Sequence, residues 1–222
     1  MKGRCHENKC SSPRKQRFWG SFTMNPWDTR YGSDEFYYGT EANDFLRESA
    51  KRISPGGAVL CLAEGEGRNA VFLAENGFKV TAVDGSSVGL AKMEKLAVSK
   101  KLSVASIVSD LSDYQIEPGK WDGIVSIWCH IPKDLRKIVH RKIVEGLRPG
   151  GILILESYHP RQLEFKTGGP PDASLMMTLN DLRGELFGLN FIVAREIERE
   201  IHEGKGHSGK SAVVQVICRK LN

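Results

Sequence analysis

Apolar runs and amphipathic segments alternate along most of the chain. The apolar runs predict strands at residues 58–63, 78–83, 104–108, 121–129 and 152–156, of which the first reads as buried. Apolar positions at helical spacing predict helices at residues 41–53, 68–76, 87–100, 132–147 and 179–187. Ser86 and Pro132 favour helix starts, and Gly77 favours a helix end. Strands and helices that alternate in this way predict a parallel sheet with right-handed crossovers and helices on both faces.

The last part of the chain departs from this alternation. Residues 191–201 and 211–219 read as two strands with no helix between them, and the segment HEGKGHSGK that joins them is rich in glycine. This pattern indicates an antiparallel hairpin. We therefore expect an α/β protein built on a doubly wound, mostly parallel seven-stranded sheet that ends in a C-terminal antiparallel hairpin.

Charge is distributed unevenly between the start of the chain and the rest. The formal charge is +5, and residues 1–23 hold six basic residues against one acidic residue, which leaves 26 of each sign in residues 24–222. We expect residues 1–23 to be a disordered basic extension and residues 24–222 to form one domain, with Met24 as a candidate native start. The neutral balance of that domain argues against nucleic acid as a partner.

Hydropathy and cysteine usage bear on the cellular location of the protein. No apolar run approaches the roughly 18 residues of a membrane-spanning helix, and residues 1–23 lack the apolar core of a secretory signal. Three cysteines lie in apolar runs, as buried free thiols of a reducing cytosol do: Cys61, Cys129 and Cys218. We expect a cytoplasmic protein with no membrane partner, either a monomer or a homodimer.

A metal site is not expected either. Cys5, His6 and Cys10 could suggest a metal clip near the start of the chain. No second pair of ligands follows at a suitable spacing, and structural zinc needs four. We therefore predict that the protein holds no metal.

The turn after the first strand, AEGEGRNA, combines glycine spacing with acidic residues. Gly65, Gly67 and Ala70 have the spacing of a nucleotide-binding turn, in which glycine lets a ligand approach the backbone. Glu64 and Glu66 would oppose a diphosphate there, because two unit charges about 4 Å apart interact by roughly 4 kcal/mol at an effective dielectric of about 20. A nucleoside that carries positive charge and no phosphate removes the conflict, and S-adenosylmethionine is such a molecule.

Acidic residues also follow the second and third predicted strands. Asp84 suits the hydroxyls of a ribose, because a carboxylate can accept hydrogen bonds from both. Asp110 and Leu111 suit an adenine, with a carboxylate for the exocyclic amine and an apolar wall. Each aspartate taken alone could equally be a helix cap. Their placement at consecutive strand ends, which meet at one edge of a parallel sheet, predicts a nucleoside site.

The sequence resembles the class I S-adenosylmethionine-dependent methyltransferases in the segments VLCLAEGEGRNAVFLA, VTAVDGSSVGLAK, VSDL, WDGIVSIWCHIP and LRPGGILILE. The resemblance covers about residues 27–220 and implies a Rossmann-like fold and S-adenosylmethionine as cofactor. Cys61 and Ala63 stand where that superfamily has aspartate and glycine. These departures, with Glu64 and the segments WDTRY, YGTEANDFL and TGGP, look like the tellurite-resistance and thiopurine-type branch. The resemblance implies methyl transfer but does not settle the acceptor, because this superfamily methylates oxygen, nitrogen, carbon, sulfur and heavier chalcogens on one scaffold. We expect a small acceptor, with a thiol or a chalcogen oxyanion as candidates.

The strand ends and the resemblance together give a set of candidate cofactor-binding residues. The set is Arg30, Tyr38, Glu64, Gly65, Gly67, Asn69, Asp84, Gly85, Ser86, Asp110, Leu111, Trp128 and Cys129. By the resemblance, residues 126–129 would pass under the methionyl group. The candidate lid consists of Arg30, Tyr31, Tyr37 and Tyr38, which would either close the pocket or simply pack against the sheet.

Histidines supply the few candidates for a catalytic base. His130 follows the fourth predicted strand, His159 follows the fifth, and His207 lies in the hairpin segment. Plain roles stay open: a helix cap for His130, a loop histidine for His159, and a place away from the pocket for His207. His140 lies in mid-helix, and we expect it at the surface. If Arg30 and the histidines line the pocket, a small anionic acceptor is favoured.

Other functions share this fold. An NAD(P)-dependent oxidoreductase is one alternative, although Glu64, Glu66 and the terminal hairpin argue against it. A non-catalytic S-adenosylmethionine-binding protein is another, because binding and catalysis use most of the same residues. A nucleic-acid methyltransferase is disfavoured by the neutral domain and by SIWCHIP, which stands where such enzymes carry an (N/D)PP(Y/F) motif.

Overall fold

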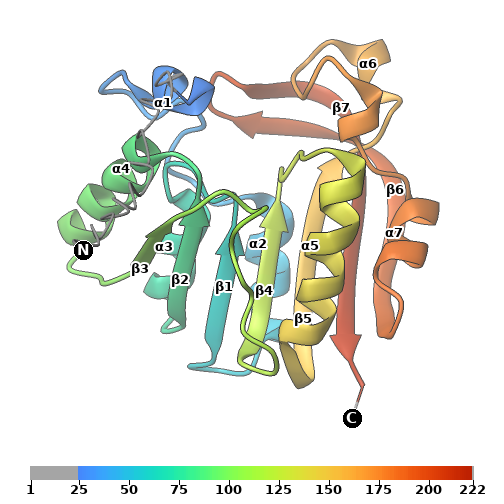
Figure 1. Ribbon diagram of the computed structural model, residues 1–222. Helices are drawn as coiled ribbons and strands as arrows, with labels where there is room; N and C mark the ends of the chain where they lie inside the picture. The colour runs from blue at the N-terminus through green and yellow to red at the C-terminus, as the bar shows by residue number, and fades with distance from the viewer. Residues whose placement is uncertain (1–24, 222) are drawn as a thin grey trace, which may run out of the picture.

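The computed structural model describes residues 25–221, and its core is one seven-stranded sheet (Figure 1). The strand order is β3-β2-β1-β4-β5-β7-β6. The strands are β1 Ala58–Leu62, β2 Lys79–Asp84, β3 Ala105–Val108, β4 Trp121–Ile127, β5 Leu147–Tyr158, β6 Leu189–Glu203 and β7 His207–Lys220. The first five strands run parallel, and β7 lies antiparallel between β5 and β6. The predicted mixed sheet with its C-terminal hairpin is confirmed.

Helices cover both faces of the sheet. They are α1 Pro26–Tyr31, α2 Asp44–Ser49, α3 Arg68–Glu75, α4 Ser87–Ser99, α5 Lys133–Gly146, α6 Gln162–Phe165 and α7 Leu179–Glu185, with 3-10 turns at Ala50–Arg52 and Ala173–Leu175. Residues of β1 alternate between the two cores: Leu60 and Leu62 pack with α5 and α7, whereas Val59 and Cys61 pack with α2, α3 and α4. In Figure 1, α5 lies in front of the sheet and α2 and α3 lie behind it. Burial on both faces explains why the central strand β1 is continuously apolar, whereas β3, at the edge of the sheet, is mostly exposed.

Side-chain caps set several helix starts. The side chain of Ser86 accepts from the backbone N–H of Gly89 at 3.0 Å, as its place before α4 predicts. The helix predicted from residue 41 instead begins after Asn43, whose side chain accepts from the Leu46 N–H at 3.0 Å. An asparagine cap therefore overrides the apolar periodicity that extends further back along the chain.

The hairpin is longer than the sequence predicts. Most of the segment expected as a loop belongs to the strands, with Ile201 opposite Gly209 and Glu203 opposite His207. The backbone of Thr167 accepts from the Ser208 N–H at 3.2 Å, and Gly168 forms a bridge with His207. The long hairpin extends beyond the carboxyl ends of the parallel strands and reaches across to α1 (Figure 1). Its polar, glycine-rich end therefore helps to build the region above the sheet.

His140 is buried, so the expectation that it lies at the surface is wrong. Its Nδ1 atom lies 2.8 Å from a carboxylate oxygen of Glu185, and Arg136 binds both oxygens of the same carboxylate. Arg136 and His140 lie one turn apart on α5, and Glu185 ends α7. The polar appearance of KIVHRK conceals this contact, because the partner comes from a helix far along the chain.

Within residues 25–221, no helix is long and apolar enough to cross a membrane. The expected basic extension at residues 1–23 and the candidate start at Met24 lie outside the described residues.

We predict that Glu185→Gln destabilises the protein by about 3–5 kcal/mol, because it leaves the buried guanidinium of Arg136 without its charge partner. Burial opposes ionisation of Glu185, but hydrogen bonds from His140 and Arg136 lower its pKa to about 2. Because the pKa of Glu185 is lower in the folded state, its ionised carboxylate stabilises the protein at pH values above 4.5, its pKa in the unfolded chain. This stabilisation is lost as the pH falls toward 2.

Urea denaturation at a series of pH values checks this prediction. The difference between wild type and Glu185→Gln should be largest near neutral pH and should shrink below about pH 4. Glu117→Gln, at an exposed carboxylate, is the matched control. Equal denaturation midpoints for Glu185→Gln and wild type at neutral pH would contradict the assignment.

Candidate functional site

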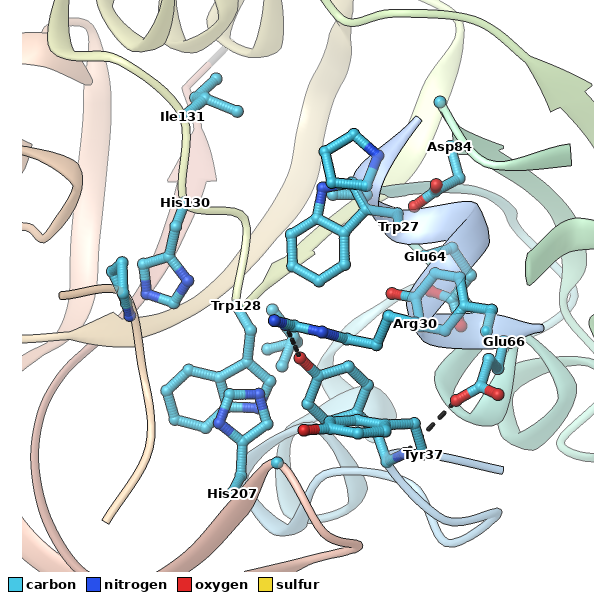
Figure 2. A pocket seen from close by; sticks show the side chains of 18 of the residues that line it. Trp27, Arg30, Tyr37, Glu64, Glu66, Asp84, Trp128, His130, Ile131 and His207 are labelled. Carbon is cyan, nitrogen blue, oxygen red and sulfur yellow. Dashed lines mark hydrogen bonds between the residues drawn. The ribbon is translucent and has the colours of Figure 1, made fainter. Parts of the chain in front are cut away.

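A pocket of about 980 Å³ lies at the carboxyl ends of the parallel strands. Strand order reverses between β1 and β4, which is where doubly wound sheets bind ligands. Most of the predicted residues line it: Arg30, Tyr38, Glu64, Asn69, Asp84, Gly85, Asp110, Leu111, Trp128, His130 and His207. In Figure 2 the carboxylates of Glu64, Glu66 and Asp84 lie on one side, Trp128, His130 and His207 lie on the other, and Arg30 lies between them.

The two glycines of the turn do not line the pocket; they pack against the helices next to it. Gly65 and Gly67 have φ values of 62° and 93°, in the left-handed region that favours glycine. A Cβ atom on Gly67 would lie 2.8 Å from the Cα of Met93 in α4, and one on Gly65 would lie 2.7 Å from the hydroxyl of Tyr31. Close packing of α4 and α1 against the turn therefore requires both glycines.

Glu64 is a buried carboxylate without a cationic partner at ion-pair distance among the described residues. Its Oε1 atom accepts from the Ala70 N–H at 2.7 Å, in the first turn of α3. Burial raises the pKa of Glu64 to about 7, and the hydrogen bond from Ala70 opposes this shift only in part. The site thus holds a carboxylate whose ionisation a nearby ligand cation would favour.

Glu66 has a different role from Glu64, although both lie in the same acidic turn. The Nζ atom of Lys92 lies 2.5 Å from one oxygen of Glu66, and the Tyr38 N–H donates to the other at 3.3 Å. Lys92 also donates to the backbone carbonyls of Ser33 and Glu35 at 2.9 and 2.7 Å. Glu66 and Lys92 therefore fasten the N-terminal segment onto α4 and leave no net charge for a ligand.

Asp84 is held by backbone amides and keeps acceptor capacity toward the pocket. Its two oxygens accept from the N–H groups of Gly65 and Ser86 at 2.8 and 2.7 Å. Each carboxylate oxygen has a further lone pair, so two hydroxyl donors can still be accepted. Asp110 is more exposed, and hydrogen bonds from Ser112 lower its pKa. Burial raises the pKa of Asp84 in spite of its two backbone hydrogen bonds. The two groups therefore offer acceptor oxygens at consecutive strand ends.

The N-terminal segment forms a roof over the pocket. The Asn25 side chain donates to the carbonyl of Gly85 at 2.8 Å. The guanidinium of Arg30 donates to the Tyr38 hydroxyl at 3.0 Å and lies over the rings of Trp27 and Tyr37, 4.7 and 5.3 Å from their centres. Among residues 25–221, Arg30 has no carboxylate at ion-pair distance. A positive group is thus held in place by aromatic side chains and remains available to a ligand.

Aromatic rings and histidines form the wall across from the carboxylates. Trp128 stacks on Tyr158 and His207 with ring centres 4.5 and 5.0 Å apart, and the Tyr158 hydroxyl lies 2.7 Å from His207 Nδ1. Burial lowers the pKa of His130 to about 4 and that of His207 to about 3, so both imidazoles are neutral near pH 7. Trp128 has a φ of 57°, which costs energy for a residue with a side chain and is typical of functional sites.

A buried carboxylate at the end of β6 holds this wall and the hairpin together. Glu203 accepts from the indole N–H of Trp128 at 2.6 Å and pairs with Arg68 at 2.5 Å. The Asn43 side chain donates to Glu203 at 2.8 Å and to Glu156 at 2.6 Å. Elements that are distant in sequence therefore meet at Glu203.

Some predicted residues lie outside the pocket lining: Gly65, Gly67, Ser86, Cys129 and His159. His159 accepts from the Arg161 N–H at 3.2 Å and lies 3.6 Å from Glu196, so its contacts point to a loop histidine. Cys129 is buried, and burial raises the pKa of its thiol to about 12. Cys61 and Cys218 are buried free thiols as well.

Sequence reasoning missed several residues that build the site: Asn25, Trp27, Arg68, Ile131, Leu135 and Tyr158. Tyr158 stands next to His159 in SYHP, so its place at a strand end could have suggested it. Arg68 gives no such signal, because its partner Glu203 is 135 residues away. The described residues contain no cluster of metal ligands, and Cys5, His6 and Cys10 lie outside them.

Comparison with known proteins finds one family model that matches part of the chain and several solved structures with the same fold. Residues 59–151 match the family described as methyltransferase domain. Comparison with curated protein sequences gives no match. Among solved structures, the chain is similar to that of a protein from work on the conversion of a disulfide bond into a thioacetal group during echinomycin biosynthesis. The identity is 19% and the TM-score 0.71, over 88% of this chain and 91% of that one.

Two further structures show the same fold. TehB from Haemophilus influenzae is 20% identical, with a TM-score of 0.66 over 87% of this chain and 65% of that one. The 1,6-didemethyltoxoflavin-N1-methyltransferase from Burkholderia thailandensis, with bound 1,6-didemethyltoxoflavin and S-adenosylhomocysteine, is 17% identical, with a TM-score of 0.58 over 81% and 79% of the two chains. Residues 59–151 therefore match a methyltransferase domain, and the chain shares the fold of these three solved structures.

Proposed function

We propose that the protein transfers a methyl group from S-adenosylmethionine to a small acceptor bound beside Trp128, His130 and His207. The observation that carries this proposal is the set of unpaired charges in the pocket. Glu64, Asp84 and Asp110 lack cationic partners among the described residues, and Arg30 lacks an anionic one. A ligand with both signs of charge and with hydroxyl and amine donors complements this set.

The residues present fit S-adenosylmethionine group by group. Glu64 would hold the α-ammonium and favour the nearby sulfonium, whereas Arg30 would hold the carboxylate of the methionyl group. Asp84 would accept from the ribose hydroxyls, and Asp110 with Leu111 would hold the adenine. Tyr38, Asn69, Gly85 and Trp128 line the same pocket and would complete the site. Four candidate residues lie outside the lining and would support the residues that form it: Gly65, Gly67, Ser86 and Cys129.

A nicotinamide cofactor suits the turn less well. The diphosphate of such a cofactor would meet Glu64 at the N-terminus of α3, and Lys92, which reaches the same turn, already pairs with Glu66. Only one of the two carboxylates of the turn, that of Glu64, therefore repels a phosphate. The repulsion is smaller than the sequence suggests, but it still disfavours a diphosphate.

Bound S-adenosylmethionine supplies an electrophilic methyl group whose departing sulfur is neutral, so no acid is needed. The contribution of the chain is alignment of the reactants and exclusion of water, for which the roof at Arg30 and Tyr38 is placed. Neutral His130 and His207 are weak bases, because their pKa values lie well below neutral pH. This favours an acceptor that needs no strong base, such as a thiol or a chalcogen oxyanion.

Other expectations remain proposals of the same kind. A place in the tellurite-resistance and thiopurine-type branch is compatible with the fold that the chain shares with TehB. A direct catalytic role is better placed for His130 or His207 than for His159, since only the first two line the pocket. A cytoplasmic location, a monomeric or homodimeric state and a single domain over residues 24–222 stay predictions.

We predict that the protein binds S-adenosylmethionine and S-adenosylhomocysteine in isothermal titration and that Asp84→Ala weakens both by about tenfold to a hundredfold. The reason is the loss of a hydrogen bond to a charged acceptor, worth about 1.5–3 kcal/mol, if water replaces the second ribose contact. Asp134→Ala, at an exposed carboxylate outside the pocket, should bind like wild type. Binding of NAD(H) alone would support an oxidoreductase, and tight binding without turnover of any acceptor would support a regulatory protein.

A second prediction concerns the protonation of Glu64. Burial raises its pKa to about 7, and a bound cation should lower it, so binding of S-adenosylmethionine at pH 6 must release a proton. Affinity should therefore rise between about pH 5.5 and 7, and titrations in buffers of different ionisation enthalpy should reveal the released proton. Glu64→Gln should bind more weakly and lose this slope; the same slope in the variant would show that another group titrates.

A further inference from the structure

Tyr158, the last residue of β5, hydrogen-bonds to both histidines of the pocket. Its backbone N–H donates to Nε2 of His130 at 3.3 Å, and its side-chain hydroxyl lies 2.7 Å from Nδ1 of His207. Tyr158 is fully buried, whereas His130 and His207 belong to the pocket lining. One residue behind the lining therefore contacts a ring nitrogen of each candidate base in the pocket.

The contact with His130 allows only one position for the ring proton. A backbone N–H can only donate, so Nε2 of His130 accepts with its lone pair. Burial keeps this ring neutral near pH 7, and a neutral imidazole carries a proton on one nitrogen and a lone pair on the other. The proton of His130 therefore sits on Nδ1, and the ring has no lone pair left for a proton of the methyl acceptor.

The contact with His207 could run in either direction, and the burial of Tyr158 selects one of them. Within residues 25–221, the Tyr158 hydroxyl has one acceptor at hydrogen-bond distance, which is Nδ1 of His207. Burial raises the pKa of Tyr158, and Ser211 opposes this shift, as a hydroxyl that donates to the phenolic oxygen does. A proton on Nδ1 would leave the tyrosine hydrogen buried without an acceptor, which is costly. Tyr158 therefore donates, and the proton of His207 sits on Nε2.

The proton on Nε2 of His207 is available to a ligand. Nε2 has no hydrogen-bond partner in the described part of the chain, yet it remains accessible. The ring stacks on Tyr38 and Trp128, with centres 4.6 and 5.0 Å apart, which holds its orientation (Figure 2). The nearby carboxylate of Glu203 accepts from three other side chains instead. His207 therefore offers an N–H donor to the pocket.

Building on the proposed function, we infer that Tyr158 is a positioning residue that fixes the tautomers of both histidines, so that His207 donates a hydrogen bond to the methyl acceptor and neither histidine removes its proton. The acceptor loses its proton to water before it reacts. Its lone pair then forms a bond to the methyl carbon, the bond from methyl to sulfonium breaks, and that electron pair stays on the departing sulfur. The N–H of His207 aligns the acceptor for this attack.

Nitrogen-15 NMR of the histidine side chains tests the tautomers directly, because a protonated ring nitrogen and a bare one resonate at well-separated positions. Near pH 7 the ring proton should be found on Nδ1 of His130 and on Nε2 of His207. The variants His130→Gln and His207→Gln assign the signals. A proton on Nδ1 of His207 would mean that this ring presents a lone pair to the pocket, and it would overturn the inference.

Tyr158→Phe separates the two contacts, because it removes the hydroxyl and keeps the backbone N–H. The two ring-nitrogen signals of His207 should move toward each other as its proton distributes over both nitrogens, while those of His130 stay in place. Tyr114→Phe, at a tyrosine outside the pocket lining, is the matched control and should leave both rings as in wild type. Unchanged signals of His207 in Tyr158→Phe, or equal changes in both histidines, would contradict the positioning role.

The donor role of His207 is tested in protein saturated with S-adenosylhomocysteine. Selenite and 2-mercaptoethanol serve as probes, one for each candidate class of acceptor. At least one of them should shift the Nε2–H signal of His207, and no shift with either would contradict the donor role. Failure of the proposed function has a separate sign, because wild-type protein would then not bind S-adenosylmethionine, whereas the ring protons can be located without any ligand.

Turnover of these probes distinguishes a donor from a base. His207→Leu should lower kcat/KM by about tenfold, and His207→Gln should lower it less, because its amide keeps a donor but cannot take up a proton. The pH dependence of kcat/KM should keep its shape in His207→Gln. Equal losses of about a hundredfold or more in the two variants would show that His207 acts as a general base and would overturn the inference.

Discussion

The pocket depends on one buried carboxylate, that of Glu203. It pairs with Arg68 at the start of α3, accepts from Trp128 after β4 and accepts from Asn43 before α2. Because a buried charge is tolerated only when its partners are in place, these contacts form together or not at all. The hairpin is thereby held across the strand ends, and Trp128 is fixed in its left-handed conformation.

The acidic turn owes its composition to two separate tasks. Glu66 serves the fold: its ion pair with Lys92 fastens the roof, because the same lysine binds carbonyls of the N-terminal segment. Glu64 remains free for a ligand, since it accepts from a backbone amide and no cation pairs with it in the described chain. The turn therefore tolerates acidic residues on both sides of Gly65 while it leaves only one of them without a cationic partner.

Local signals in the sequence were enough to predict the sheet and the gathering of three acidic residues in one pocket. Glu64, Asp84 and Asp110 each follow a strand, and parallel strands bring their carboxyl ends together whatever the rest of the chain does. The acceptor half depends on contacts between distant segments, such as Tyr158 with His207, which leave no periodic pattern. The burial of His140 and the pairing of the glycine-rich hairpin were missed for the same reason.

The measurement that tests the account most directly is a crystal structure of the protein with S-adenosylhomocysteine. The account predicts the ribose hydroxyls on Asp84, the adenine beside Leu111 and Asp110, and the amino-acid end between Glu64 and Arg30. The thioether sulfur should face Trp128. An amino-acid end bound away from Glu64 and Arg30, or a ribose that does not contact Asp84, would contradict the assignment of the unpaired charges to the cofactor.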